Sequence, residues 1–331
     1  MMHRRHLLAA AGASLLPTMG HSAVLPDGKQ MRMVVPFPPG GQGDTVARLY
    51  SEALTAATGQ SVLIDNRAGG NGVIGVEAIV RSPPDGSTVG LLNVAAFTFL
   101  PLMMARPSYD PARDLTVITR VASSTAVCVV TAERARQRGW TDFRALINWA
   151  KQPGNELSDG SSGNGSLAHL LIALVARRTG ASILHAPYRG GAPAATDLLA
   201  GNLDMIFDFM PALMPHIQSG RLVALAVGSN GRSPIMPDVP SMAEFADLNL
   251  AEVDLQSWNA LCGPAGLSRD IVSRLYEGFK LASASPLLAE RLGASGLIAG
   301  VSDSATAVQD QIRHEMPMWR EMVEVSGAKI D

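Results

Sequence analysis

The chain has 331 residues, which is enough for two domains with separate cores or for one large α/β domain. Hydrophobic residues make up 47% of it and charged residues 17%, with 32 Gly and 21 Pro, a composition typical of a globular, loop-rich protein and not of a disordered one. A formal net charge of −2 without a block of basic residues argues against nucleic-acid binding.

The first 23 residues have the pattern of an export signal. Arg4 and Arg5 form a basic start, an apolar run follows at residues 7–16, and small residues occupy positions 20–23. The apolar run is too short to span a bilayer. We therefore expect a cleaved signal peptide over residues 1–23 and a periplasmic protein that is soluble after cleavage. Sec secretion is favoured over the twin-arginine route that the arginine pair also suggests.

Strand-like and helix-like segments then alternate along nearly the whole chain, which predicts an α/β fold with mostly parallel sheets. Through residue 152, strands are expected at residues 31–37, 61–65, 88–93, 117–121 and 126–131, and helices at residues 44–58, 75–82 and 141–152. Beyond it, strands are expected at residues 182–186, 204–208, 222–227 and 258–263, and helices at residues 167–179, 192–200 and 211–219. Three more helices are expected from Ser268, Pro286 and Ala305, with Pro317 kinking or dividing the last one.

Two changes in composition, at residues 122–125 and 228–240, are typical of crossings between lobes. They predict a discontinuous first lobe made of residues 28–122 and 229–331. The second lobe is then continuous and comprises residues 123–228.

Two similar loops lie about 120 residues apart and are the most informative feature of the chain. Residues 38–44 have the sequence Pro-Pro-Gly-Gly-Gln-Gly-Asp, and residues 159–166 have the sequence Asp-Gly-Ser-Ser-Gly-Asn-Gly-Ser. Each follows a short apolar run and precedes a segment with helical periodicity. A glycine turn that leads into a helix presents unpaired N–H groups at the positive end of the helix dipole, which suits an anion. The pair predicts two cups that close on one small anionic ligand.

Candidate ligand-binding residues lie in these loops and at the carboxyl ends of two later strands, where ligands bind in open α/β sheets. Around the first loop they are Phe37, Pro39, Gly40, Gly41 and Asp44, of which Asp44 is better suited to cap the helix. In the second loop they are Ser161, Ser162, Gly163, Asn164, Gly165 and Ser166. At the later strand ends they are Tyr188, Arg189 and Asp208. A surface ion pair for Arg189 and a helix cap for Asp208 are the alternatives.

The sequence offers no positive sign of catalysis, and no cofactor is expected. Residues 70–75 match the pattern GxGxxG, but they lie in the second strand–helix unit and no acid follows at the distance that a dinucleotide site requires. The second loop does not form a GxSxG elbow, because Asn164 holds the place of the last glycine.

The two cysteines and the internal histidines have ordinary structural interpretations. Cys128 and Cys262 lie in apolar surroundings and are expected to be buried free thiols rather than a disulfide, and no metal site is expected. His169, His185 and His216 are expected to be packed, hydrogen-bonded residues rather than chemical groups.

Taken together, these segments resemble the extracytoplasmic solute receptors of the tripartite tricarboxylate transporter type, the Bug/TctC family. Each matching motif is weak alone, but their order and spacing extend over roughly 300 residues. The matching stretches are residues 34–41 with Asp44 and Arg48, 66–67 with 69–72 and Gly75, 84–86, Ser161 with 163–165 and 169–170, 185–190 with Pro193 and 197–198, 207–208, 225–227, 237–240 with Glu244, and Trp258.

The resemblance implies a two-lobed periplasmic binding protein, type II-like, that closes on its ligand like a Venus flytrap. Each lobe would be a mostly parallel sheet flanked by helices. Loops of the two kinds described above would hold a small carboxylate, an organic acid or an amino acid, largely through backbone N–H groups and ordered water. The protein, a monomer, would deliver it to the membrane subunits of a tripartite tricarboxylate-type transporter. The alternatives are a sensing subunit that docks a signalling protein and an exported hydrolase acting on a small acid.

The sequence departs from the family pattern at three places. Asp159 stands where the family usually has Tyr, Arg189 where it has Lys, and Leu100-Pro101 where it often has Asn-Pro. An Arg in place of Lys keeps the charge and allows bidentate contact with a carboxylate. Phe97, Arg189 and Asp208 are expected to select among acids at the far end of the cleft.

Overall fold

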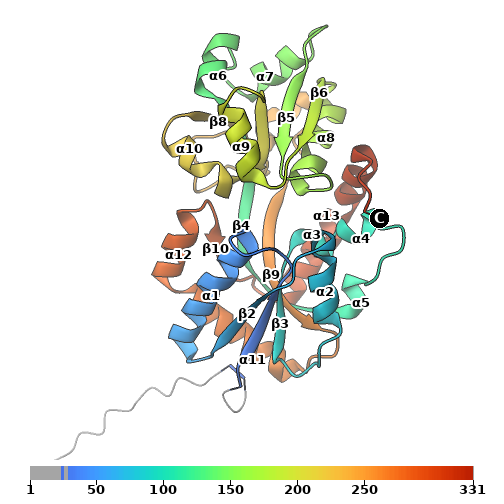
Figure 1. Cartoon of the computed structure of the whole chain (residues 1–331), viewed down its shortest axis with the longest axis vertical. Helices are drawn as coiled ribbons and strands as arrows, with labels where there is room; N and C mark the ends of the chain where they lie inside the picture. The colour runs from blue at the N-terminus through green and yellow to red at the C-terminus, as the bar shows by residue number, and fades with distance from the viewer. Residues whose placement is uncertain (1–23, 26–28, 331) are drawn as a thin grey trace, which may run out of the picture.

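The computed structural model describes residues 24–25 and 29–330, so the predicted signal peptide at residues 1–23 lies outside the described residues. The chain forms two α/β lobes, one above the other in Figure 1, and two strands, β4 and β9, run between them. The expected α/β class with two lobes is confirmed. No helix within residues 24–25 and 29–330 has both the length and the apolar character needed to cross a membrane.

Ten strands form one sheet, in which eight are paired in the order β2-β1-β3-β9-β4-β7-β5-β6 and the other two, β8 and β10, pair with β4. Their bounds are β1 Met31–Val35, β2 Val62–Asn66, β3 Thr88–Asn93, β4 Leu115–Thr131, β5 Leu157–Ser161, β6 Ile183–Pro187, β7 Met205–Phe209, β8 Leu222–Val227, β9 Gln256–Pro264 and β10 Ile298–Ala299. The pairs β1–β2, β1–β3, β5–β6 and β5–β7 are parallel. All pairs that involve β4 or β9 are antiparallel. Each lobe therefore has a parallel part, and the long strands join the two parts.

Strand β4 is one continuous strand of 17 residues where the sequence predicts two. Its first part, through Thr125, pairs with β9, and its last part, from Ala126, pairs with β7 and β8. The small residues at 122–125 do not end the strand, because each of them pairs with a residue of β9. Cys128 on β4 and Cys262 on β9 are buried and free, as expected.

Helices cover both faces of the parallel parts. The longer α-helices are α1 Gln42–Thr58, α2 Val73–Val80, α6 Ala132–Arg138, α7 Phe143–Ala150, α8 Leu167–Thr179, α9 Gly191–Leu199, α11 Arg269–Ser283, α12 Pro286–Gly293 and α13 Ala305–Ser326. The short α-helices are α3 Val94–Phe97, α4 Leu100–Met103, α5 Pro111–Asp114 and α10 Met214–Gln218, and the 3-10 helices are η2 Gly70–Gly72, η3 Met210–Ala212 and η4 Met242–Leu248. Helix α13 continues through Pro317, so the proline does not divide it, and the alternative of a kink there stays a prediction.

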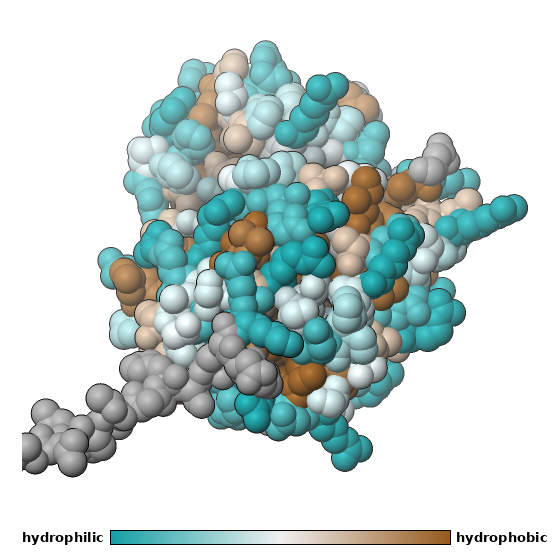
Figure 2. Space-filling view, turned by 60° about the horizontal axis from the view of Figure 1, so that its bottom comes forward, coloured by the Kyte–Doolittle hydropathy of each residue, from teal (hydrophilic) through white to brown (hydrophobic). Residues whose placement is uncertain are grey.

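The apolar spacing of the sequence explains the helices that border the cleft. In α1, Val46, Leu49 and Leu54 recur at helical spacing and are buried, and the helix ends at Gly59, whose φ of 73° suits glycine. In α8, Leu170, Leu174 and their neighbours form the buried face in the same way. On the face shown in Figure 2, hydrophobic residues form small patches separated by hydrophilic ones.

The lobe boundaries predicted near residues 122 and 229 stay predictions. Helix η4 follows the predicted return to the first lobe, yet its Phe245 ring lies 5.3 Å from the ring of Phe143 on α7. Arg144 on α7 also forms an ion pair with Asp247 of η4 at 2.7 Å. These contacts favour a later return to the first lobe, at β9.

The glycines of the GxGxxG segment have a structural explanation. Gly70 and Gly72 have φ values of 56° and 103°, which glycine adopts readily. Gly75 lies where α2 crosses the end of β1, and a Cβ there would come within 2.6 Å of the Pro36 Cβ and 2.7 Å of the Pro36 Cα. The motif therefore serves a turn and a close helix–strand contact.

We expect Gly75→Ala to lower the free energy of unfolding by about 1–3 kcal/mol, because the added methyl group meets backbone that cannot move aside. Gly293→Ala is the matched control, since a Cβ at that helical position meets nothing within 4 Å. Thermal unfolding followed by circular dichroism measures both variants. Equal melting temperatures for the two would contradict the packing argument.

Candidate functional site

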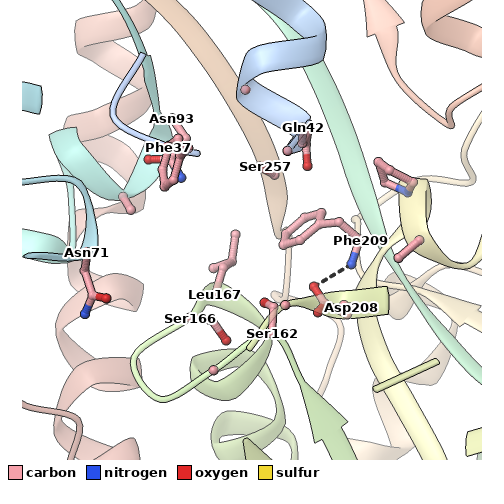
Figure 3. A pocket seen from close by; sticks show the side chains of 18 of the residues that line it. Phe37, Gln42, Asn71, Asn93, Ser162, Ser166, Leu167, Asp208, Phe209 and Ser257 are labelled. Atoms are coloured by element: carbon pink, nitrogen blue, oxygen red, sulfur yellow. Dashed lines mark hydrogen bonds between the residues drawn. The ribbon is translucent and has the colours of Figure 1, made fainter. Parts of the chain in front are cut away.

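A cleft of about 870 Å³ lies between the lobes. Loops that follow β1, β3, β5, β6 and β7 line it, together with residues of β9. These loops all lie at carboxyl ends of strands, where ligands bind in open α/β sheets. Figure 3 shows how side chains from the two lobes face this space.

The first loop leads into α1 with its helix N-terminus open. The N-cap residue is Gly41, which has no side chain to accept from the first N–H groups, and no other side chain caps this end. Gly40 precedes it with a φ of 83°, a conformation that favours glycine. The first-turn N–H groups of α1 are therefore available to an anion in the cleft.

Asp44 holds the first loop from behind. It is 3% exposed, and its carboxylate accepts hydrogen bonds from the Gly40 N–H at 2.9 Å, Arg48 Nε at 2.9 Å and Asn66 Nδ2 at 3.0 Å. Burial raises the pKa of Asp44, but the bonds from Arg48, Gly40 and Asn66 outweigh it and lower the pKa overall. Asp44 lies in the first turn of α1 rather than at the expected N-cap position, and it does not line the cleft.

The second loop is braced from behind by two histidines. The His169 and His185 rings stack with centroids 3.9 Å apart. His169 Nδ1 accepts from the Gly165 N–H at 3.1 Å, and His185 Nε2 lies 2.6 Å from Ser161 Oγ. Burial lowers the pKa of both histidines, that of His185 to about 4, so both are neutral at pH 7. They fix the loop without adding charge.

The Ser161–His185 pair does not form an accessible nucleophile. Ser161 is fully buried at the end of β5, and its Oγ accepts from the Gly163 N–H at 3.2 Å. Ser166 is the N-cap of α8, where its Oγ accepts from the His169 N–H at 3.2 Å. Ser162, Asn164 and the hydroxyl hydrogen of Ser166 are the side-chain donors of this loop at the cleft.

A third helix N-terminus, that of α9, also borders the cleft. Its N-cap is Gly190, and no side chain caps it. Tyr188 lines the cleft and donates its hydroxyl to Asp197 at 2.7 Å. Arg189 is exposed at the rim and takes part in none of the ion pairs between described residues. The sequence predicts this segment as cleft lining, but the further open helix end is visible only in the structure.

Asp208 ends β7 as a buried carboxyl that lines the cleft. It is 6% exposed, and its Oδ1 accepts from the Phe209 N–H at 2.7 Å (Figure 3). Burial raises its pKa to about 6, although bonds from Phe209 and Ser162 act in the opposite direction.

The first lobe adds amide and hydroxyl groups that the sequence analysis missed. Asn93 at the end of β3 and Ser257 and Asn259 on β9 line the cleft. Asn259 Oδ1 is buried without a hydrogen-bond partner among the described residues. Phe97 was expected at the far end of the cleft, but it does not line the cleft. It is buried and stacks on Trp258 with centroids 5.5 Å apart.

The sequence model of the tripartite tricarboxylate transporter family receptor, TctC, matches residues 46–327. The chain belongs to this family. Protein BugT of Bordetella pertussis is 34% identical over 339 residues, covering 99% of this chain and all of the relative. The structure of R. palustris Rpa4515 with adipate is similar with a TM-score of 0.77 and 29% identity, covering 91% of this chain and 98% of the other. The periplasmic binding protein BugD gives a TM-score of 0.73 and 28% identity over 91% and 98% of the two chains.

Most of the predicted site residues of this TctC-family chain border the cleft. Phe37, Gly40, Gly41, Ser162–Ser166, Tyr188, Arg189 and Asp208 all line it. Pro39, Asp44 and Ser161 do not line the cleft. Asp44 and Ser161 lie behind the two loops. Gln42, Asn71, Asn93, Ser257 and Asn259 line the cleft but were not predicted. Contact of any of these residues with a ligand stays a prediction.

Asp159, where the sequence departs from the TctC family pattern, lies beneath the second loop rather than in the cleft. It is fully buried in β5, and its Oδ1 accepts from the Phe207 N–H at 3.0 Å. Its Oδ2 has no partner among the described residues. Burial raises its pKa well above the usual value, so the neutral acid is favoured and the expected extra negative charge is suppressed.

Asp159→Asn should flatten the pH dependence of stability in this TctC-family receptor. A raised folded-state pKa contributes stability that is complete below the unfolded-state pKa, about 4, and is lost as pH rises toward the folded-state pKa. Asparagine mimics the neutral acid, so the wild type should lose up to about 1.4 kcal/mol per pH unit relative to the variant above about pH 4.

Urea unfolding between pH 4 and pH 8 measures this difference. Asp303→Asn, at an exposed aspartate in the first lobe, is the matched control and should follow the wild type. Parallel curves for the wild type and Asp159→Asn would show that the buried carboxyl does not titrate with a raised pKa.

Proposed function

We propose that this protein is a periplasmic solute receptor that binds a small carboxylate in the cleft and delivers it to the membrane subunits of a tripartite tricarboxylate-type transporter. The observation that carries the proposal is the meeting of two anion-attracting loops across one cleft. The open N-terminus of α1 faces it from the first lobe, and the Ser162–Ser166 loop faces it from the second.

The two loops supply enough binding energy without a buried basic residue. A charge-assisted hydrogen bond contributes roughly 1.5–3 kcal/mol. Three or four such bonds, from N–H groups of the α1 end and donors of the second loop, reach the roughly 8 kcal/mol of a micromolar dissociation constant after ordering costs. Because the loops belong to different lobes, the ligand contacts both only when the lobes approach, so it stabilises the closed state.

Similarity to known proteins supports the carboxylate class. The R. palustris relative of known structure, 29% identical to this chain, is described with adipate, a dicarboxylate. The export-signal pattern of residues 1–23 is consistent with the periplasm and with Sec secretion. We propose that the mature receptor acts as a monomer, because one chain supplies both halves of the cleft.

Thermal unfolding in the presence of small carboxylates tests the proposal. At a hundredfold excess over the dissociation constant, a ligand adds about 2.7 kcal/mol, which is visible as a rise of several degrees in melting temperature. The panel contains succinate, adipate, glutamate and benzoate, each with its uncharged amide. We expect a shift with at least one acid and none with its amide. No shift with any acid, for protein unfolded and refolded to release retained ligand, would contradict the carboxylate class.

Gly41→Leu should abolish the ligand-induced shift while the fold is kept. A Cβ at Gly41 meets only the Pro38 carbonyl, at 3.5 Å, so the chain accommodates a side chain there, but leucine would project beside the α1 N-terminus. Affinity should fall at least a hundredfold by isothermal titration calorimetry.

Gly231→Leu is the control for this variant, because that exposed glycine also accepts a Cβ freely and lies outside the cleft. It should bind like the wild type. Unchanged affinity in Gly41→Leu would remove the first loop from the binding site.

A further inference from the structure

The Asp208 carboxyl has an environment that the binding of an anion alone does not explain. Among the described residues that line the cleft, the charged ones are Asp208 and Arg189. Arg189 is exposed at the rim, whereas Asp208 is 6% exposed. In Figure 3 its side chain stands beside Ser162, on the second-lobe side of the cleft. A site that attracts an anion thus contains a buried acid.

The partners of Asp208 are all neutral. Its Oδ1 accepts from the Phe209 N–H at 2.7 Å, and Ser162, whose polar groups act to lower the pKa of Asp208, lies beside it. A Cβ at Gly191, on the first turn of α9, would lie 3.8 Å from Asp208 Oδ2, so this oxygen is next to an uncapped helix end. Asp208 takes part in none of the ion pairs formed within the described part of the chain.

The charge behind Asp208 does not supply the missing cation. Asp159, in the same lobe, is fully buried, and because burial raises its pKa the neutral acid is favoured, so it offers Asp208 no positive charge. Burying an ionised carboxylate is unfavourable unless a cation or several donors pair with it. A second carboxylate brought beside Asp208 would repel it or force a proton to be shared. A ligand ammonium would instead form a charge-assisted hydrogen bond in a site shielded from water.

We propose that Asp208 is a specificity-determining residue that selects carboxylates bearing a protonated amine over the same acids without one. This inference rests on the proposed receptor function and names the ligand class: a zwitterion of amino-acid type. The ligand carboxylate lies between the α1 end and the second loop, and its ammonium donates to Asp208. The ligand thereby supplies the cation that Asp208 lacks among the described residues.

Isothermal titration calorimetry with matched ligand pairs tests the assignment. The pairs are glutamate and glutarate, aspartate and succinate, and 6-aminohexanoate and hexanoate, whose members differ only in the amine. The wild type should bind the amine-bearing member of at least one pair tenfold or more tightly. Asp208→Asn keeps the size of the side chain and an oxygen for the Phe209 N–H. It should weaken that ligand tenfold or more and leave the amine-free acid equal or tighter.

Asp247→Asn is the control, because it removes a carboxylate from the same lobe at an exposed position outside the cleft. It should retain the wild-type preference, and thermal unfolding should show all three proteins folded. Equal or tighter wild-type binding of the amine-free acids in every pair would overturn the assignment while leaving the receptor function intact. An equal loss of affinity for both members of a pair in Asp208→Asn would also overturn the assignment and leave the receptor function intact. No binding of any pair member or panel acid would overturn both proposals.

Discussion

The pairing of β4 with β9 is the interaction on which the rest of this structure depends, because these two strands run between the lobes. The same backbone that forms a ladder with β9 through Thr125 continues as the partner of β7 and β8 to Thr131. The parallel strands of both lobes are therefore aligned through one shared strand, and loops at their carboxyl ends open into one space. The position of the cleft is therefore determined by the strand topology, and the side chains determine only how its walls are lined.

The two loops that border the cleft are each held by hydrogen bonds to side chains on the side away from the cleft. Asp44 ties the first loop to Arg48 and Asn66, and its ionised carboxylate is matched by the Arg48 cation. The second loop is tied through Ser161 and Gly165 to a pair of neutral imidazoles. In both cases the polar brace adds little net charge to the cleft. The electrostatic field at a bound ligand then comes mainly from the helix ends, the Asp208 carboxyl and Arg189.

Short sequence patterns predict much of the fold and of the site. The positions that they do not predict depend on strand register and on pairing between distant strands. The glycine loops and the strand–helix alternation are visible in short windows of sequence. Strand β5, however, extends through Ser161, so Asp159 and Ser161 lie two residues apart on one buried face while Ser162 faces the cleft. Asn93 and Asn259 meet only because β3 pairs with β9 across a long stretch of chain. No short sequence pattern predicts the pairing of β3 with β9.

The C-terminal helix α13 constrains how the lobes can move. Its Glu321 pairs with Arg178 of α8 at 2.8 Å, while its Trp319 ring lies 5.2 Å from Phe99, which follows α3 of the first lobe. Beyond it, the Ile330 N–H donates to the Met103 carbonyl at 2.9 Å. The lobes are thus tied by two strands and, at a separate place, by a helix. A motion of one lobe against the other must therefore bend both strands and shift the contacts of α13 together. Such a joint sets an upper limit on the length of any molecule that can enter and still be enclosed.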